Sequence, residues 1–182
     1  MTAEDSINKA FLSSFEIFKK NYVTLIIGTL IALLLMILII TIPPMIFGIY
    51  YMCIQLMNGK RIKVSDVFKG FDYFFLSWGI MLISLIGILI GLALLVIPGI
   101  LLMIMLQYAV PVAIIEKKGV FASISRSYEL AKKNFTFSIA FWILLGVLNS
   151  LGAFTRIGTL LTIPFTATAL SIAAAELGKK KA

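Results

Sequence analysis

Three long apolar stretches dominate the chain and cover residues 22–59, 73–115 and 135–175. Each is about twice the ~20 residues that a helix needs to cross a bilayer once. Each is interrupted near its middle, by Pro43-Pro44, by Pro98-Gly99 and by Arg156-Ile157-Gly158. The pattern predicts an all-α integral membrane protein with six transmembrane helices that form three hairpins.

Apolar residues also recur at helical spacing just before each stretch. In the first copy Ile7, Phe11, Phe15 and Phe18 fall on one helical face, and Lys9, Glu16 and Lys20 lie elsewhere. Basic, aromatic helices of this kind favour the membrane interface. We expect an interfacial amphipathic helix before each hairpin, on the cytoplasmic side; the alternative is that these segments extend the spans into the cytosol. The expected anchors are Phe11, Phe15, Phe71 and Tyr128.

The chain contains an internal repeat. Residues 14–22 and 127–135 are identical at five of nine positions at an offset of 113, and a weaker copy lies at 70–74. Repeats of this kind indicate one structural unit used several times. We expect a single membrane domain over 1–182, with parallel repeat units near 5–59, 62–116 and 118–176 and a basic tail at 177–182.

The charges set the expected orientation. With paired spans, every Lys and Arg except Arg156 falls on one side, together with all 8 acidic residues. Basic loops stay on the cytoplasmic side, so we expect a plasma (inner) membrane protein with both termini in the cytoplasm. The net charge of +8 is then a topology signal and gives no reason to expect nucleic acid as a partner. Anionic headgroups of the cytoplasmic leaflet are expected near Lys19, Lys20, Lys132 and Lys133.

Residues able to carry chemistry are scarce. There is no His, Cys53 is the only Cys, and the apolar stretches lack Asp, Glu and Lys. We therefore expect no catalytic constellation, no cofactor and no metal site. Gln55, Gln107 and Asn149 could line a polar cavity if they converge; the alternative is hydrogen bonding between helices. Pro111 and Pro164 predict kinks within spans. Small residues expected at helix contacts are Gly87, Gly91, Gly146, Ser150, Ala167 and Ser171.

Three short segments resemble a known superfamily. They are Val67-Phe68-Lys69-Gly70-Phe71, Ile97-Pro98-Gly99-Ile100, and Arg126-Ser127 followed by Leu130 and Lys133. The chain is similar to prokaryotic six-span proteins related to the membrane domain of glycerophosphodiester phosphodiesterases, which include the mostly uncharacterised YciC-like proteins. Ser123 departs from this pattern, which often has Ala there. The family's phosphodiesterase chemistry belongs to a separate soluble barrel, so the resemblance implies a fold and a prokaryotic plasma membrane.

Two functions are consistent with these features. The first is a non-enzymatic envelope scaffold, or a regulatory or anchoring partner, that shapes or thins the bilayer. The second is a small channel or transporter subunit for an apolar or zwitterionic compound. Expected partners are membrane lipids, together with a membrane protein or a second copy of the chain. A sealed apolar core would favour the scaffold, and a continuous cavity would favour the transporter.

Overall fold

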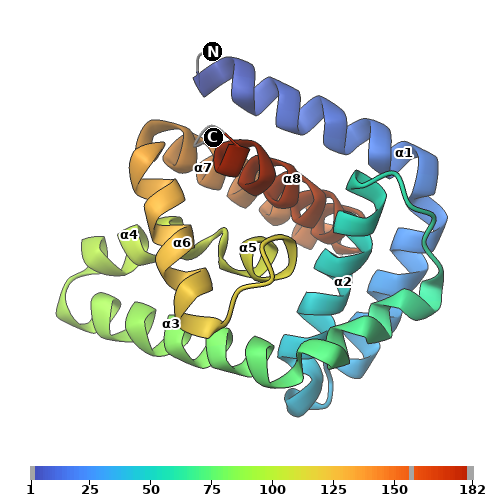
Figure 1. Ribbon diagram of the computed structural model, residues 1–182, viewed down its shortest axis with the longest axis horizontal. Coiled ribbons are helices and arrows are strands. Elements are labelled where there is room, and N and C mark those ends of the chain that lie inside the picture. Colours follow the sequence, from blue (N-terminus) through green and yellow to red (C-terminus); the bar gives the residue numbers. More distant parts are fainter. Residues whose placement is uncertain (1–2, 156–157, 180–182) are drawn as a thin grey trace.

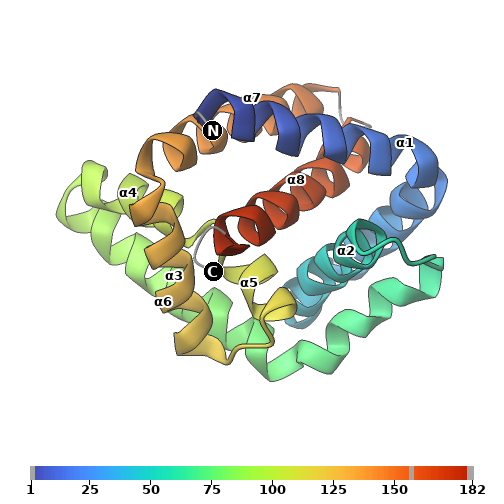
Figure 2. The same ribbon diagram turned by 45° about the horizontal axis from the view of Figure 1, so that its top comes forward.

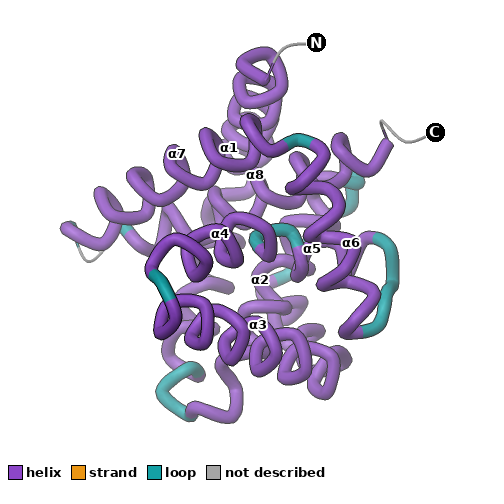
Figure 3. The backbone as a smooth tube through the Cα atoms, turned by 90° about the vertical axis from the view of Figure 1, so that its left-hand side faces the viewer, coloured by secondary structure: helices purple, strands orange, loops and turns teal. Residues whose placement is uncertain are grey.

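The computed structural model describes residues 3–155 and 158–179, and these ranges contain helices and no strand. Figure 1 shows the helices folded back on one another, and Figure 3 shows that the connections between them are short. The elements in chain order are α1 (Ala3–Leu35), η1 (Ile39–Thr41), α2 (Ile42–Met57), η2 (Val64–Tyr73), α3 (Phe74–Leu94), α4 (Val96–Leu106), α5 (Ala109–Ile115), α6 (Val120–Lys133), α7 (Phe135–Phe154) and α8 (Thr159–Lys179).

Six helical segments of the described chain are long and apolar enough to cross a membrane. The prediction of an all-helical chain with six candidate spans is therefore confirmed, and it agrees with a multi-pass membrane protein. The segments, some of which join adjacent elements, are Asp5–Leu35, Ile39–Met57, Val64–Leu94, Val96–Ile115, Phe135–Phe154 and Thr159–Lys179.

Each amphipathic segment is set off from the span that follows it by a non-helical residue. Within α1 that residue is Asn21, with φ −131° and ψ 18°, where the helix bends in Figure 1. Tyr73, the last residue of η2, leaves the helical region before α3 with φ −105° and ψ 20°. Asn134 separates α6 from α7 with φ −121° and ψ 48°. The amphipathic segments therefore do not extend the spans in a straight line.

The amphipathic segments pack on the return helices of the hairpins. The helix η2 packs on α2, α6 packs on α4 and α5, and the first half of α1 packs on α8 (Figures 1 and 2). Two of these segments thus contact the return helix that precedes them in the chain. The third contact, between α1 and α8, joins the first and last helices of the chain, so the three contacts form a cyclic arrangement.

Small residues form the docking face of these segments. Ala10 and Ser14 of α1 are buried, as are Ser123 and Ser127 of α6 and Gly70 of η2. Small side chains let helix backbones approach closely. In α1 the inward face is therefore turned by about one residue, roughly 100°, from the aromatic face marked by sequence periodicity. In η2 the apolar Val67 is buried together with Gly70.

The expected aromatic anchors divide into two groups. The Phe11 ring packs edge-on against Phe165 of α8, with centroids 5.0 Å apart. By contrast, Phe15 is 54% exposed, Tyr128 43% and Phe71 39%. Phe11 thus contacts the bundle, and the other three rings remain available to lipid.

Two glycines bring η2 against α2. A Cβ on Gly48 would collide with the Val67 carbonyl, and a Cβ on Gly70 with the Pro44 carbonyl. Gly70 therefore lies beside the start of α2, about 20 Å along the helix axis from its end at Met57. We expected an upright α2 with this segment lying flat at its cytoplasmic end. An upright α2 and a flat η2 are incompatible, because the two helices run side by side.

The interruptions seen in the sequence are displaced from the turns. Pro43 and Pro44 lie in the first turn of α2, and the chain reverses before them, between α1 and α2. Pro98 likewise lies in the first turn of α4, after the non-helical Leu95. The reason is that a helix tolerates Pro in its first turn, where no N–H bond is lost. Arg156 and Ile157 of the third interruption lie outside the described residues.

The C-terminal residues extend the last helix. α8 continues through Lys179, and Leu177 is buried in the core. The expected basic tail at 177–182 therefore does not begin at Leu177; residues 180–182 lie outside the described part of the chain. At this end Lys9 forms an ion pair with Glu176 at 2.7 Å, which ties α1 to α8.

Candidate functional site

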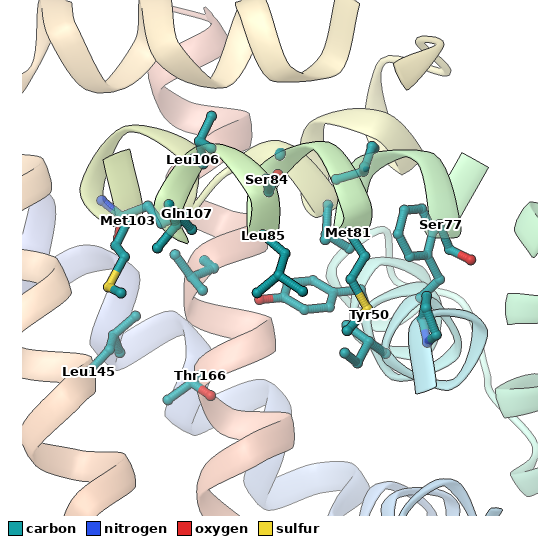
Figure 4. Close-up of a pocket in the computed structure, with 18 of the residues that line it drawn as sticks. Tyr50, Ser77, Met81, Ser84, Leu85, Met103, Leu106, Gln107, Leu145 and Thr166 are labelled. Atoms are coloured by element: carbon teal, nitrogen blue, oxygen red, sulfur yellow. The ribbon is translucent and has the colours of Figure 1, made fainter. Parts of the chain in front are cut away.

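A cavity of about 590 Å³, open on one side to the surface of the bundle, lies among the spans. Its walls come from α2, α3, the α4–α5 region, α7 and α8 (Figure 4). Most lining side chains are apolar, among them Phe47, Met81 and Leu145. Among the described residues that line it, none carries a charge. The uncharged side chains with polar atoms are Tyr50, Ser77, Ser84, Gln107, Trp142, Asn149 and Thr166.

Figure 4 shows how these side chains are spread along the cavity. Gln107 and Met103 lie at one end and Ser77 at the other, while Tyr50 reaches from α2 beneath Leu85 of α3. The polar groups are thus separated by hydrocarbon. Ligand sites with mostly apolar walls and a few placed polar groups are typical of small-molecule binding in proteins.

Gln107 is placed by a break in its span. Gln107 and Tyr108 separate α4 from α5, and Pro111 follows four residues after Gln107. Proline removes the N–H that would bond the carbonyl four residues earlier, so the helix is weakened at this point. Gln107 Nε2 donates to the carbonyls of Ile104 at 3.0 Å and Ser138 at 3.1 Å. Both amide hydrogens are used, whereas Oε1 is buried without a partner among the described residues.

Ser127 of α6 holds the broken span together. Its hydroxyl donates to the Met105 carbonyl at 2.7 Å and accepts from the Tyr108 N–H at 3.1 Å. The Tyr108 side chain is fully buried, and its hydroxyl lies 3.2 Å from that of Ser138 on α7. A hydroxyl both donates and accepts, so one serine satisfies two backbone groups. The sequence analysis did not predict the hydrogen bonds that Ser127 makes to Met105 and Tyr108. Two sequence features pointed to this place: Pro111, which weakens the helix, and Ser127, which recurs in the internal repeat.

The other hydroxyls at the cavity differ in their hydrogen bonding. Ser77 donates to the Phe74 carbonyl at 2.8 Å, and Thr166 donates to the Thr162 carbonyl at 2.8 Å. Bonds of this kind to the preceding helical turn let short polar side chains sit in an apolar span. Ser84 Oγ is buried and has no hydrogen-bond partner in the described chain. Gln107 Oε1 and Ser84 Oγ thus lie behind the wall surface, shielded from the cavity itself.

The three amides expected to converge do so in part. Gln107 and Asn149 both line the cavity, and Gln55 does not. Gln55 is half-buried on α2, five residues after Tyr50. Five residues turn a helix by about 140° beyond one full turn, so Gln55 faces away from the side that Tyr50 presents to the cavity.

The small residues expected at helix contacts also divide. Gly91 lies against the Gly99 backbone in the α3–α4 hairpin, and Ala167 and Ser171 are buried on α8. A Cβ on Gly87 or Gly146 would meet nothing within 4 Å, and Ser150 donates to the Gly146 carbonyl on an exposed surface. Within the described chain those faces of α3 and α7 are open, so the helix contacts expected at Gly87, Gly146 and Ser150 stay a prediction.

The described charged and metal-ligating groups lie away from the cavity. Arg126 joins Glu116 at 3.2 Å and Glu129 at 3.4 Å, and Lys118 joins Glu116 at 3.1 Å. No group of three metal-ligating side chains occurs among the described residues. The buried Cys53 thiol donates to the Pro164 carbonyl at 3.4 Å and does not line the cavity. The cavity walls are therefore suited to enclosing an uncharged molecule.

Comparisons with known proteins leave the site without a precedent: no family model, no curated protein and no solved structure matches the chain.

Proposed function

We propose that the protein is a channel or transporter subunit that accepts an apolar molecule in its central cavity. The observation that carries this proposal is the cavity of about 590 Å³ with predominantly apolar walls and no charged lining residue. Its volume falls in the range of roughly 300–1,000 Å³ typical of small-molecule sites. A sealed core would instead have favoured the scaffold expected from sequence.

Thermodynamics supports a bound molecule in this space. Protein interiors are close-packed, and unfilled volume forfeits dispersion contacts. An apolar guest would supply the missing contacts along the apolar walls.

A non-enzymatic scaffold remains the second candidate, and the α3–α4 hairpin supports it. Leu89, Leu94 and Ile97 on this hairpin are more than half exposed. Lipid, a membrane-protein partner or a second copy of the chain could cover such a surface. The helix α2, of 16 residues, reaches only about 24 Å and would thin the bilayer if it stood upright.

The setting of the protein is part of the proposal. We place it in a prokaryotic plasma membrane, with both termini in the cytoplasm, from the one-sided distribution of Lys and Arg. We also propose membership of the YciC-like superfamily and a threefold parallel repeat of hairpins. The cyclic packing of α1 on α8, η2 on α2, and α6 on α4 and α5 supports the repeat.

Reconstitution separates the two candidate functions. Purified protein would be placed in liposomes that carry a spin-labelled neutral lipid, and exchange between leaflets would be followed by chemical reduction of the outer label. A transporter accelerates exchange over protein-free vesicles. A scaffold leaves exchange unchanged and instead co-purifies with a membrane partner at fixed stoichiometry.

A further inference from the structure

The turn between α1 and α2 is a largely exposed apolar surface. Ile37 and Ile39 are 77% and 73% exposed, and Leu38 and Ile40 are also more than half exposed. We propose that this turn inserts among the acyl chains of the leaflet on which the basic loop after α2 lies. The first hairpin then dips into one leaflet and returns without crossing the membrane. This inference goes beyond the proposed function and does not depend on what the cavity binds.

The arm of α1 that leads to the turn is short. It begins at the bend at Asn21 and ends at Leu35, so it advances about 21 Å along its axis. The hydrocarbon core of a bilayer is about 30 Å thick. The arm therefore does not reach the opposite face from a bend that lies at the headgroups.

A hydrogen bond ties the turn to the beginning of α3. The Trp78 indole donates from Nε1 to the Ile40 carbonyl at 3.1 Å, and Figure 1 shows the turn beside the junction of η2 and α3. Trp78 follows Phe74, the first residue of α3, by four residues, which is about 6 Å along the helix axis. The turn thus lies at the level where α3 begins, on the side of η2.

Charged side chains on η2 place that level near the headgroups. A Cβ on Gly70 would collide with the Pro44 carbonyl, so η2 passes beside the start of α2 at this residue. Lys69 and Asp72 have side chains that are more than half exposed and form an ion pair at 3.7 Å. Exposed charges avoid the hydrocarbon region. Because residues 60–63 carry three basic side chains after the other end of α2, both ends of α2 lie near the same headgroup layer.

Acyl chains match the chemistry of the exposed turn. Its four consecutive side chains are apolar, and the charges of η2 lie beside it. An apolar surface next to charged residues fits hydrocarbon that lies directly below a headgroup layer. The occupant is therefore the lipid of that leaflet, and cover by a protein partner or a second copy of the chain is an outcome of the test.

Leaflet-selective quenching tests the inference. Full-length protein with Cys53→Ser and Leu38→Cys would carry a small fluorophore at position 38 in liposomes. An affinity tag at the C-terminus would separate liposomes with the termini outside from those with the termini inside. A nitroxide phospholipid with a charged headgroup, added from outside, enters the outer leaflet. We expect several-fold stronger quenching when the termini face outward.

Two further variants control the experiment. Lys60→Cys should react with a membrane-impermeant maleimide only in liposomes with the termini outside, which verifies their orientation. Ile39→Cys repeats the quenching at the neighbouring turn residue if Leu38→Cys does not fold. Stronger quenching with the termini inside, or equal quenching in both orientations, overturns the inference because the turn then lies in the other leaflet or at the bilayer centre. Absence of quenching in both orientations also overturns it, because protein then covers the turn.

Discussion

Asn21 and Asn134 lie 113 residues apart in the sequence and make the same hydrogen bond. Each side chain donates from Nδ2 to the carbonyl four residues earlier, Asn21 to Ile17 at 3.3 Å and Asn134 to Leu130 at 3.0 Å. Each backbone leaves the helical region at that residue. Each amide binds the helical turn that precedes the bend, and the Leu130 carbonyl also accepts the Asn134 backbone N–H at 3.2 Å, so the two bends share this side-chain contact.

Removing the first of these bonds should loosen α1 from α8. Asn21→Ala deletes the hydrogen bond and introduces the best helix former, which favours a straight α1. Spin labels on cysteines at Leu12 and Leu161, in a Cys53→Ser background, would report the separation by pulsed electron resonance. We expect a longer and broader distance distribution. Glu16→Ala, on the exposed side of α1, is the control, and an unchanged distribution in Asn21→Ala would count against the bend.

The glycines offer a second, internally controlled prediction. Gly48→Ala and Gly70→Ala place a Cβ against a backbone carbonyl of the neighbouring helix, and such overpacking costs about 1–3 kcal/mol. Gly87→Ala and Gly146→Ala enter open space and should be neutral or gain up to about 1 kcal/mol in helix propensity. Thermal unfolding in detergent would rank the four variants. Equal losses of thermal stability in all four variants would refute the close contact between η2 and α2.

Sequence periodicity identified the segments correctly and their docking faces less well. The six candidate spans follow from apolar length, because nothing else buries so many apolar residues. Hydrophobicity alone did not identify which face of each amphipathic segment packs inward. Ala10, Ser14, Ser123 and Ser127 are buried because they are small, whereas the large aromatic side chains of Phe15 and Tyr128 are exposed.

The candidate site was predictable in part. Gln107 and Asn149 were noticed as rare amides in apolar spans, and both line the cavity. The exclusion of Gln55 depends on the rotation of α2 about its own axis, which its nearly uniform apolar sequence does not specify. The Ser127 bridge joins α6 to Tyr108 at the break between α4 and α5, and such contacts are fixed by tertiary packing.

The two repeat-equivalent serines should differ in importance. Ser127→Ala leaves the buried Tyr108 N–H without its acceptor, a loss of about 1–3 kcal/mol. Ser14 donates only to the Ala10 carbonyl of its own helix, at 2.6 Å, so Ser14→Ala should cost well under about 1 kcal/mol. Denaturant titration followed by tryptophan fluorescence would compare them. If Ser14→Ala lowers the free energy of unfolding as much as Ser127→Ala does, the hydrogen bond from Tyr108 to Ser127 adds no stability of its own.

Orientation can be tested directly. Fusions of a reporter active only in the cytoplasm to either end of the chain should both give signal, because an even number of crossings and one-sided basic residues place both ends on one face. A matched reporter active only outside the cytoplasm should be silent at both ends. A signal from that second reporter at either terminus would rule out the proposed topology.

Native mass spectrometry of protein purified from its own membranes would show whether the cavity among the spans holds a small molecule. Ser84→Trp fills the cavity from α3, and Ile86→Trp places the same bulk on an exposed position of α3. We expect one bound molecule in the wild type and in Ile86→Trp, and none in Ser84→Trp. Absence of a bound molecule from all three proteins, or equal retention by Ser84→Trp, would show that the cavity is not a binding site.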